Sequence, residues 1–123
     1  MSYETALKTI DTQVAGADLS AKQYYIVKTD SAGAVVLAGD GEVASGVLQN
    51  KPTSGQAASY AVDGVSKVVV SGAITAGGLV MSDSNGKGTA HTGSGKNAFG
   101  RALETSTTDG DIIAVQLNVT DIA

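Results

Sequence analysis

The sequence predicts an all-β protein, on three observations. β-branched and aromatic residues gather in short runs such as Tyr24–Thr29, as in strands. Turn residues separate these runs at short intervals, as in Asp30–Gly33 and Ser82–Gly86. The 16 glycines disfavour long helices, because glycine is a poor helix former. We therefore expect a small barrel or sandwich with two similar halves, preceded by an extended N-terminal arm.

The expected strands follow one another at short spacing along the chain. They cover residues 24–29, 34–37, 43–49, 57–62, 65–70, 79–81, 98–104 and 111–119. Asp63-Gly64, between two of these runs, is a strong hairpin signal. Each strand is thus expected to end at a tight turn before the next begins.

An internal repeat accounts for the arrangement of the turns. Residues of the first half recur after 53 to 55 positions, and the matching pairs are Val27/Val80, Asp30/Asp83, Ser31/Ser84, Gly33/Gly86, Gly39/Gly93, Gly41/Gly95, Ala44/Ala98, Gly46/Gly100, Leu48/Leu103 and Gly55/Gly110. We expect two pseudo-repeated halves over about 24–70 and 77–119. Gly33, Gly46, Gly86 and Gly100 are the expected structural glycines, and a glycine inside a strand marks a bulge or a close backbone approach.

Residues 1–20 differ from the rest of the chain. Leu7, Ile10 and Val14 have a weak helical spacing, but no clear cap precedes them and Gly16 interrupts the pattern. We therefore divide the chain into an extended arm over 1–20 and a β domain over 21–123, with a short helix in the arm as the alternative. A segment of this kind orders when it is laid over a partner. Its candidate apolar anchors are Tyr3, Leu7, Ile10, Val14 and Leu19.

Charge and composition exclude several classes of partner. The net charge is −4, and the eight lysine and arginine residues are scattered along the chain. Nucleic-acid binding and membrane-surface binding both need clustered basic residues, so neither is expected. The chain has no cysteine, which excludes disulfides and thiolate metal sites and fits synthesis in a reducing cytoplasm. The N-terminus lacks the basic start and apolar run of a signal peptide.

Motifs that resemble catalytic or binding sites fail when their spacing is tested. The single His91 has no second histidine for a zinc site, and Asp83–Gly86 lacks the later ligands of a calcium loop. Gly93–Lys96 resembles a phosphate loop, but Ala90 and Asn97 stand where glycine and serine or threonine are required. We therefore expect no cofactor or metal.

Two pairs of acidic residues are the remaining candidates for catalysis. Asp40/Glu42 and Asp109/Asp111 each flank a turn glycine, which is where hairpins usually carry acidic residues. The one Phe, four Tyr and no Trp leave few aromatic rings on which a sugar could stack. The sequence therefore predicts no catalytic residues and a protein that is not an enzyme.

Several runs resemble the capsid cement, or decoration, proteins of tailed phages. They are Ala44–Pro52 followed by Gly55–Ala58, then Gly64–Val68, Gly72–Gly77, Ala98–Glu104 and Asp109–Val115. The resemblance covers about residues 24–117, and its motifs are mostly structural glycines.

The resemblance implies a structural virion protein, made in the host cytoplasm, that binds the outer surface of the phage head and stabilises the capsid lattice. It implies a homotrimer, a major capsid protein as partner, and a capsid-binding role for the N-terminal arm. The alternative is a binding module displayed on the virion, either a head-fibre base or a carbohydrate-binding domain.

Overall fold

Strands make up all the regular secondary structure of the described residues. The computed structural model describes residues 4–93 and 95–117, and this part of the chain contains no helix. Its nine strands are β1 (Thr5–Val14), β2 (Ile26–Thr29), β3 (Val35–Leu37), β4 (Gly46–Leu48), β5 (Ala57–Val69), β6 (Leu79–Ser82), β7 (Gly88–Ala90), β8 (Ala98–Ala102) and β9 (Ile112–Leu117). The all-β expectation is confirmed, and the sequence pattern missed β1 and β7.

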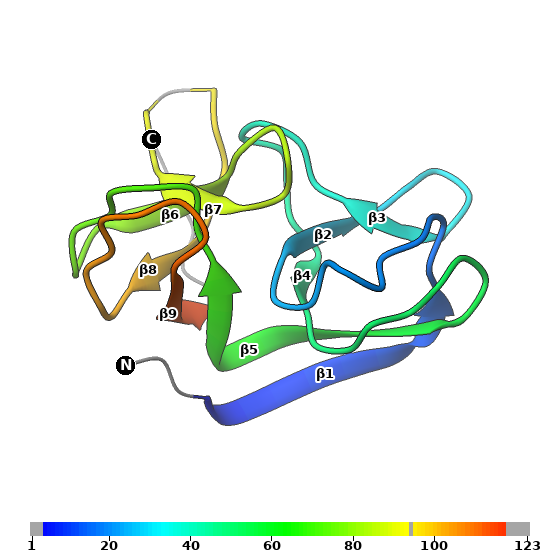
Figure 1. Ribbon diagram of the computed structural model, residues 1–123. Coiled ribbons are helices and arrows are strands. Elements are labelled where there is room, and N and C mark those ends of the chain that lie inside the picture. Colours follow the sequence, from blue (N-terminus) through cyan, green and yellow to red (C-terminus); the bar gives the residue numbers. More distant parts are fainter. Residues whose placement is uncertain (1–3, 94, 118–123) are drawn as a thin grey trace.

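The strands form one antiparallel sheet that curls into a half-barrel (Figure 1). Their order is β3-β2-β4-β5-β9-β8-β6-β7, and β1 pairs with β5 outside this path. In Figure 1, β2, β3 and β4 form one group, β6 to β9 form a second, and β5 passes between them. The molecule therefore has two halves joined through a single long strand.

The expected hairpin at Asp63-Gly64 is wrong. Strand β5 continues through these residues, pairing with β4 before them and with β9 after them. Gly64 has a positive φ of 94°, and its N–H bonds to Oδ1 of Asp63 at 2.9 Å. The dipeptide therefore marks an irregular point within one strand. The expectation failed because pairing with three neighbouring strands, β1, β4 and β9, outweighs the local turn preference.

The segment expected to be an arm lies against the β domain. Strand β1 pairs antiparallel with β5, and three register shifts interrupt the ladder. Beyond the strand, Ala15 and Leu19 are buried in the core. Thr5–Val14 is extended, so the helical alternative is wrong for these residues. A domain boundary at residue 20 would separate Leu19 from the side chains that it packs against.

Small aliphatic side chains build the core in two clusters. The larger cluster joins both halves and includes Ile26, Val68 and Phe99. The smaller cluster lies in the first half, where Leu19 and Leu48 pack together. Along β9, the side chains of Ile113 to Val115 and of Leu117 are buried, whereas Ile112 and Gln116 are exposed.

Equivalent strands follow the same order in the two halves. The first half reads β3-β2-β4-β5 and the second reads β7-β6-β8-β9. The N–H of Ala15 donates to Gln56 as that of Val70 donates to Asp111, both at 2.9 Å. Ala15 also forms a parallel bridge with Val35, as Val70 does with Gly88. These interactions support the predicted repeat, which stays an inference, and they place β1 as the counterpart of the second part of β5.

Gly46 and Gly100 occupy matching places in β4 and β8. A Cβ on Gly100 would lie 2.5 Å from the carbonyl oxygen of Gln116, and one on Gly46 would clash with that of Ala61. Both glycines are therefore required by close backbone approach, as a glycine in a strand indicates.

For one pair of the sequence repeat, the structure shifts the match by one residue. The N–H of Gln49 donates to Ser59 at 2.7 Å, and that of Leu103 donates to Ala114 at 2.9 Å. Leu103 thus takes the place of Gln49, whereas the sequence repeat pairs it with Leu48.

Candidate functional site

The five apolar residues expected to anchor the arm have different environments. Leu19 is buried and Leu7 is half-buried against the core, so these two side chains stabilise the domain. Ile10 and Val14 are 38% and 47% exposed, and Tyr3 lies outside the described residues. Of the anchors that are described, Ile10 and Val14 therefore present the most exposed apolar surface. The capsid-binding role of this segment stays a prediction.

The two turn glycines close matching hairpins. Gly33 ends the turn between β2 and β3 with φ of 82°, and Gly86 ends the turn between β6 and β7 with φ of 79°. This left-handed region favours glycine. Gly86 also lies against Leu37 and the carbonyl of Ile26, so the second hairpin packs on the first half.

A pinned loop presents Val43 to solvent. The carboxylate of Glu42 accepts from Lys28 at 2.8 Å and from the N–H of Gly39 at 2.6 Å. The hydrogen bond from Lys28 is the main reason that the pKa of Glu42 lies below its usual value. The carbonyl of Gly41 accepts from both the backbone and side-chain nitrogens of Asn97, at 2.9 and 3.0 Å. Val43 is nevertheless 70% exposed.

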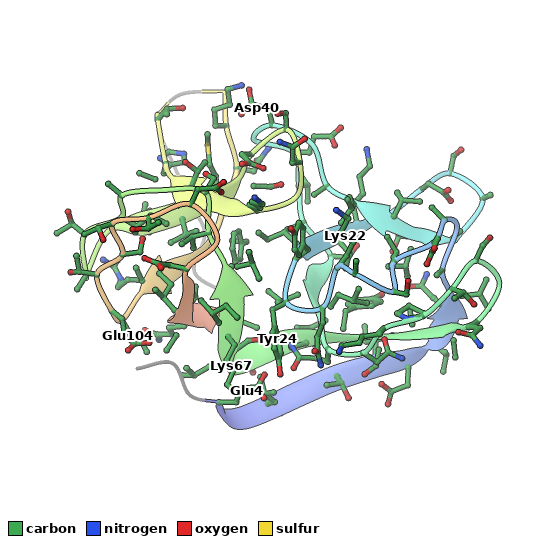
Figure 2. The ribbon with its side chains drawn as sticks, in the orientation of Figure 1. Glu4, Lys22, Tyr24, Asp40, Lys67 and Glu104 are labelled. Carbon is green, nitrogen blue, oxygen red and sulfur yellow. The ribbon has the colours of Figure 1, made fainter. Side chains whose placement is uncertain are left out.

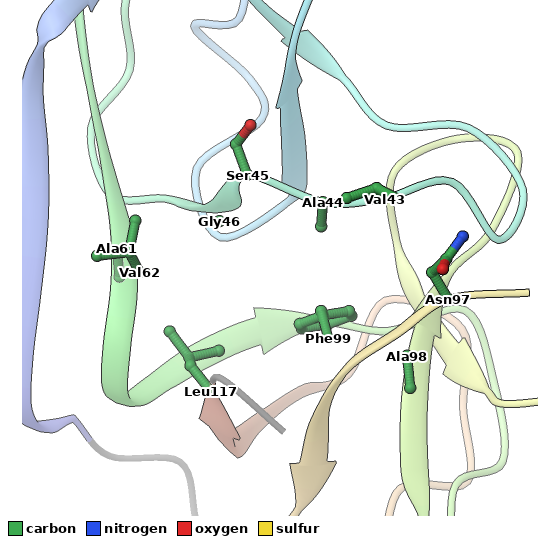
Figure 3. Close-up of a pocket in the computed structure, with 10 residues that line it drawn as sticks. All are labelled: Val43, Ala44, Ser45, Gly46, Ala61, Val62, Asn97, Ala98, Phe99 and Leu117. Atoms are coloured by element: carbon green, nitrogen blue, oxygen red, sulfur yellow. The ribbon is translucent and has the colours of Figure 1, made fainter. Parts of the chain in front are cut away.

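A small pocket opens beside this loop (Figure 3). Its volume is about 170 Å³, and most of its lining is apolar, including Val43, Phe99 and Leu117. Pockets that bind small molecules usually have volumes of about 300–1,000 Å³. This pocket is thus smaller than those that usually bind small molecules.

Polar side chains join the halves near the bend of β5. Figure 2 shows Glu4, Tyr24 and Lys67 close together there. The Lys67 ammonium lies 5.7 Å from the centre of the Tyr24 ring, and Ser66 Oγ lies 3.5 Å from Glu4 Oε2. Gln49 donates to Ser66 Oγ at 2.8 Å. This cluster stabilises the junction, since each group has a partner inside the chain.

The acidic residues considered for catalysis have structural partners. Asp40 pairs with Lys96 at 2.7 Å, and Asp109 pairs with Lys87 at 2.9 Å. The hydrogen bond to Asp109 raises the pKa of Lys87. Asp111 accepts from the N–H groups of two threonines at 3.2 and 3.1 Å, and so closes its own turn. These carboxylates contribute to turns and surface ion pairs.

The structure describes His91, the single histidine of the chain, within residues 4–93 and 95–117. His91 contacts the carbonyl of Lys96 at 3.0 Å through its ring nitrogen. Within those ranges, histidine, cysteine and acidic side chains form no group of three that could hold a metal. No helix there has the length and hydrophobicity needed to cross a membrane.

The exposed residues Val43, Leu103 and Ile112 were not singled out by sequence reasoning. Each lies in or beside an expected strand, where an aliphatic residue is normally assigned to the core. The repeat held one usable signal, because Val43 corresponds to the polar Asn97, whereas the match of Leu103 to the polar Gln49 comes from the structure. An apolar residue in the place of a polar one indicates a difference in environment.

Fold and surface together define a class: a small β module with a half-barrel sheet and exposed apolar residues. Comparison with known proteins is more specific. The family model described as phage cement protein matches residues 5–117. The chain therefore belongs to the phage cement protein family.

A solved structure with the same fold is the N base of head fiber gp8.5 from bacteriophage phi29. Its TM-score is 0.69 at 12% sequence identity, and the alignment covers 95% of this chain and 98% of that one. At this identity the likeness concerns the fold alone. No curated protein matches the chain.

Proposed function

We propose that this chain is a capsid cement protein that binds the outer surface of a phage head and stabilises its lattice. Its partner in this role is the major capsid protein, and it acts as a homotrimer without a cofactor or catalytic activity. The observation that carries the proposal is the family match over residues 5–117.

The surface of the described chain supports a structural role. Exposed apolar residues occur at several separate places, namely Ile10, Val14, Val43, Leu103 and Ile112. Single exposed apolar residues contribute little alone, but several can join copies of the chain to one another and to a lattice, and an oligomer that contacts a lattice at several points gains strength from multivalency. Stabilisation by many weak contacts fits a cement protein.

The experiment is a binding assay with purified, expanded heads of the phage that encodes this chain. Protein is mixed with heads, the heads are sedimented, and bound protein is quantified at increasing concentration. Saturable binding to heads supports the cement function, and failure to bind heads at any stage of maturation contradicts it. A parallel glycan-binding assay tests the carbohydrate alternative and is expected to be negative.

A head-fibre base is the second candidate function. The fold likeness to the phi29 head fiber N base favours it. A base carries a further fibre, whereas a cement protein acts by itself. Electron microscopy of decorated heads separates the two, because only a base would show an additional projecting partner in virions.

A further inference from the structure

The two halves of the molecule contact each other through different sets of residues. The carbonyl of Tyr24 in the first half accepts at 3.0 Å from Val69. Val69 lies in the second part of β5, which belongs with the second half because β1 is its counterpart in the first. The N–H of Ile26 donates to Gly86 at 2.7 Å. Each of these four residues has an equivalent in the other half of the repeat. The equivalents are Val14 for Val69, Gly33 for Gly86, Gly77 for Tyr24 and Leu79 for Ile26.

The reciprocal contacts are not made. Within the described chain, no hydrogen bond joins Val14 to Gly77 or Gly33 to Leu79. The halves therefore meet through two different surfaces, and the relation is heterologous. One copy of each surface is used inside the chain, and a second copy of each points outward.

Exposure identifies the two outward surfaces. Inside the chain, the second half contributes Val69, Gly86, Asn97 and Ser82, whose carbonyl accepts from Gly41 at 2.8 Å. Their counterparts on the first half form the first surface and are all exposed, namely Val14, Gly33, Val43 and Thr29. Inside the chain, the first half contributes Tyr24, Gly41 and Gln49. Their counterparts on the second half form the second surface and are also exposed, namely Gly77, Gly95 and Leu103.

Apolar exposure is concentrated on these surfaces. The described chain has five exposed large apolar residues, and Val14, Val43 and Leu103 are three of them. Val43 replaces Asn97, which is bonded across the internal contact, and Leu103 replaces Gln49, which is also bonded across it. Apolar residues thus stand where the internal contact has polar ones, as expected for a surface that another chain covers.

We propose that a second copy of this chain occupies these surfaces, with the second surface of one copy docked on the first surface of the next. The docking repeats the contact already present between the two halves. Head-to-tail contacts close into a ring when the rotation allows it. A ring of three copies would be the homotrimer of the proposed function, on whose oligomeric state this inference rests.

The test uses one variant of each surface. Val43→Asp damages the first surface and Leu103→Asp damages the second, at side chains that are 70% and 36% exposed. Native mass spectrometry and light scattering at about 10 µM protein measure the mass. We expect wild type at three times the 12.2 kDa monomer mass and each variant alone as a monomer.

Mixing the two variants gives the decisive result. Each variant retains the surface that the other has lost, so an equimolar mixture should form a heterodimer that cannot close. The control Ile112→Asp introduces the same charge at a residue on neither surface and should leave the wild-type mass unchanged. Circular dichroism of each variant checks that it is folded.

Three results would overturn the inference: a wild-type monomer, variants that keep the wild-type mass, or a mixture that does not pair. Each is distinguishable from failure of the proposed function, because head binding is measured separately. If the protein is a monomer that binds heads, the cement function is supported and this inference is wrong. If it forms a head-to-tail ring that does not bind heads, this inference is supported and the cement function is wrong.

Discussion

Asp30 and Asp83 make the same pair of backbone hydrogen bonds in the two halves of the molecule. Oδ1 of Asp30 accepts from Ala32 and Ala34, both at 2.9 Å. Oδ1 of Asp83 accepts from Asn85 at 2.8 Å and from Lys87 at 2.9 Å. Each carboxylate satisfies two N–H groups of its own hairpin turn, which explains why aspartate stands at both places.

Replacing Asp83 should therefore cost more stability than replacing an aspartate that only forms a surface ion pair. Asp83→Ala leaves two N–H groups without their acceptor, and we expect a loss of about 1–3 kcal/mol. Asp109→Ala removes an exposed pair with Lys87 and should cost less than about 1 kcal/mol. Denaturant unfolding measures both. Asp83→Asn keeps an acceptor oxygen and should lie between them, whereas equal losses for the two alanine variants would refute this role.

Gly110 provides a test of backbone conformation without side-chain contacts. Its φ is 92°, and a Cβ at this residue would meet nothing within 4 Å. Gly110→Ala should thus destabilise the fold by about 1–2 kcal/mol through conformation alone. Gly72 is the matched control, since it has equal space and no positive φ. Gly72→Ala should be neutral or stabilising by up to about 1 kcal/mol in the same thermal melt.

Glu42 should make stability depend on pH in the acidic range. Its folded pKa lies below the ordinary 4.5, chiefly through the hydrogen bond from Lys28 and also through the N–H of Gly39. A lowered pKa stabilises the fold above the ordinary value, and the contribution is lost as the pH falls through the folded pKa.

Glu42→Gln should accordingly melt at a lower temperature than wild type at neutral pH. The difference should shrink as the pH falls below 4.5 and disappear once the pH lies below the folded pKa, where both proteins carry an uncharged group at this position. A difference that stays constant from neutral to acidic pH would show that the carboxylate charge is not its cause.

Ile10 tests the part of the N-terminal segment that remains exposed. Deleting residues 2–20 would also remove Ala15 and Leu19 from the core, so a point substitution is the sharper experiment. Ile10→Asp should reduce binding to heads at least about tenfold if this side chain contacts the capsid. Thr12→Asp adds the same charge to an exposed residue of the same strand and should bind normally. Wild-type binding by Ile10→Asp would remove this residue from the capsid contact.

Local patterns predicted most of the short strands in both halves. The strands that became β2, β3, β4, β6, β8 and β9 were expected within a few residues, because turn residues such as glycine and aspartate separate many of them. Strand β1 was not expected, because its pairing with β5 depends on residues about 50 positions away. No local signal reports such a partner.

The candidate surfaces were less predictable than the strands. Exposure of Val43 depends on the hydrogen bonds that hold Glu42 and Gly41, and these come from separate parts of the chain. Burial of Leu19 depends in the same way on the position of Leu48. Sequence alone identified both as apolar and could not show which one faces solvent.

The most direct test of the cement function is the rupture temperature of purified heads, measured by release of packaged DNA to an intercalating dye. Heads that lack the protein are heated with and without saturating wild-type protein. The cement function predicts a higher rupture temperature with the protein, and a smaller gain with Ile10→Asp at equal concentration. If the protein saturates the heads and their rupture temperature does not change, it decorates the capsid without stabilising it, and the central claim is contradicted.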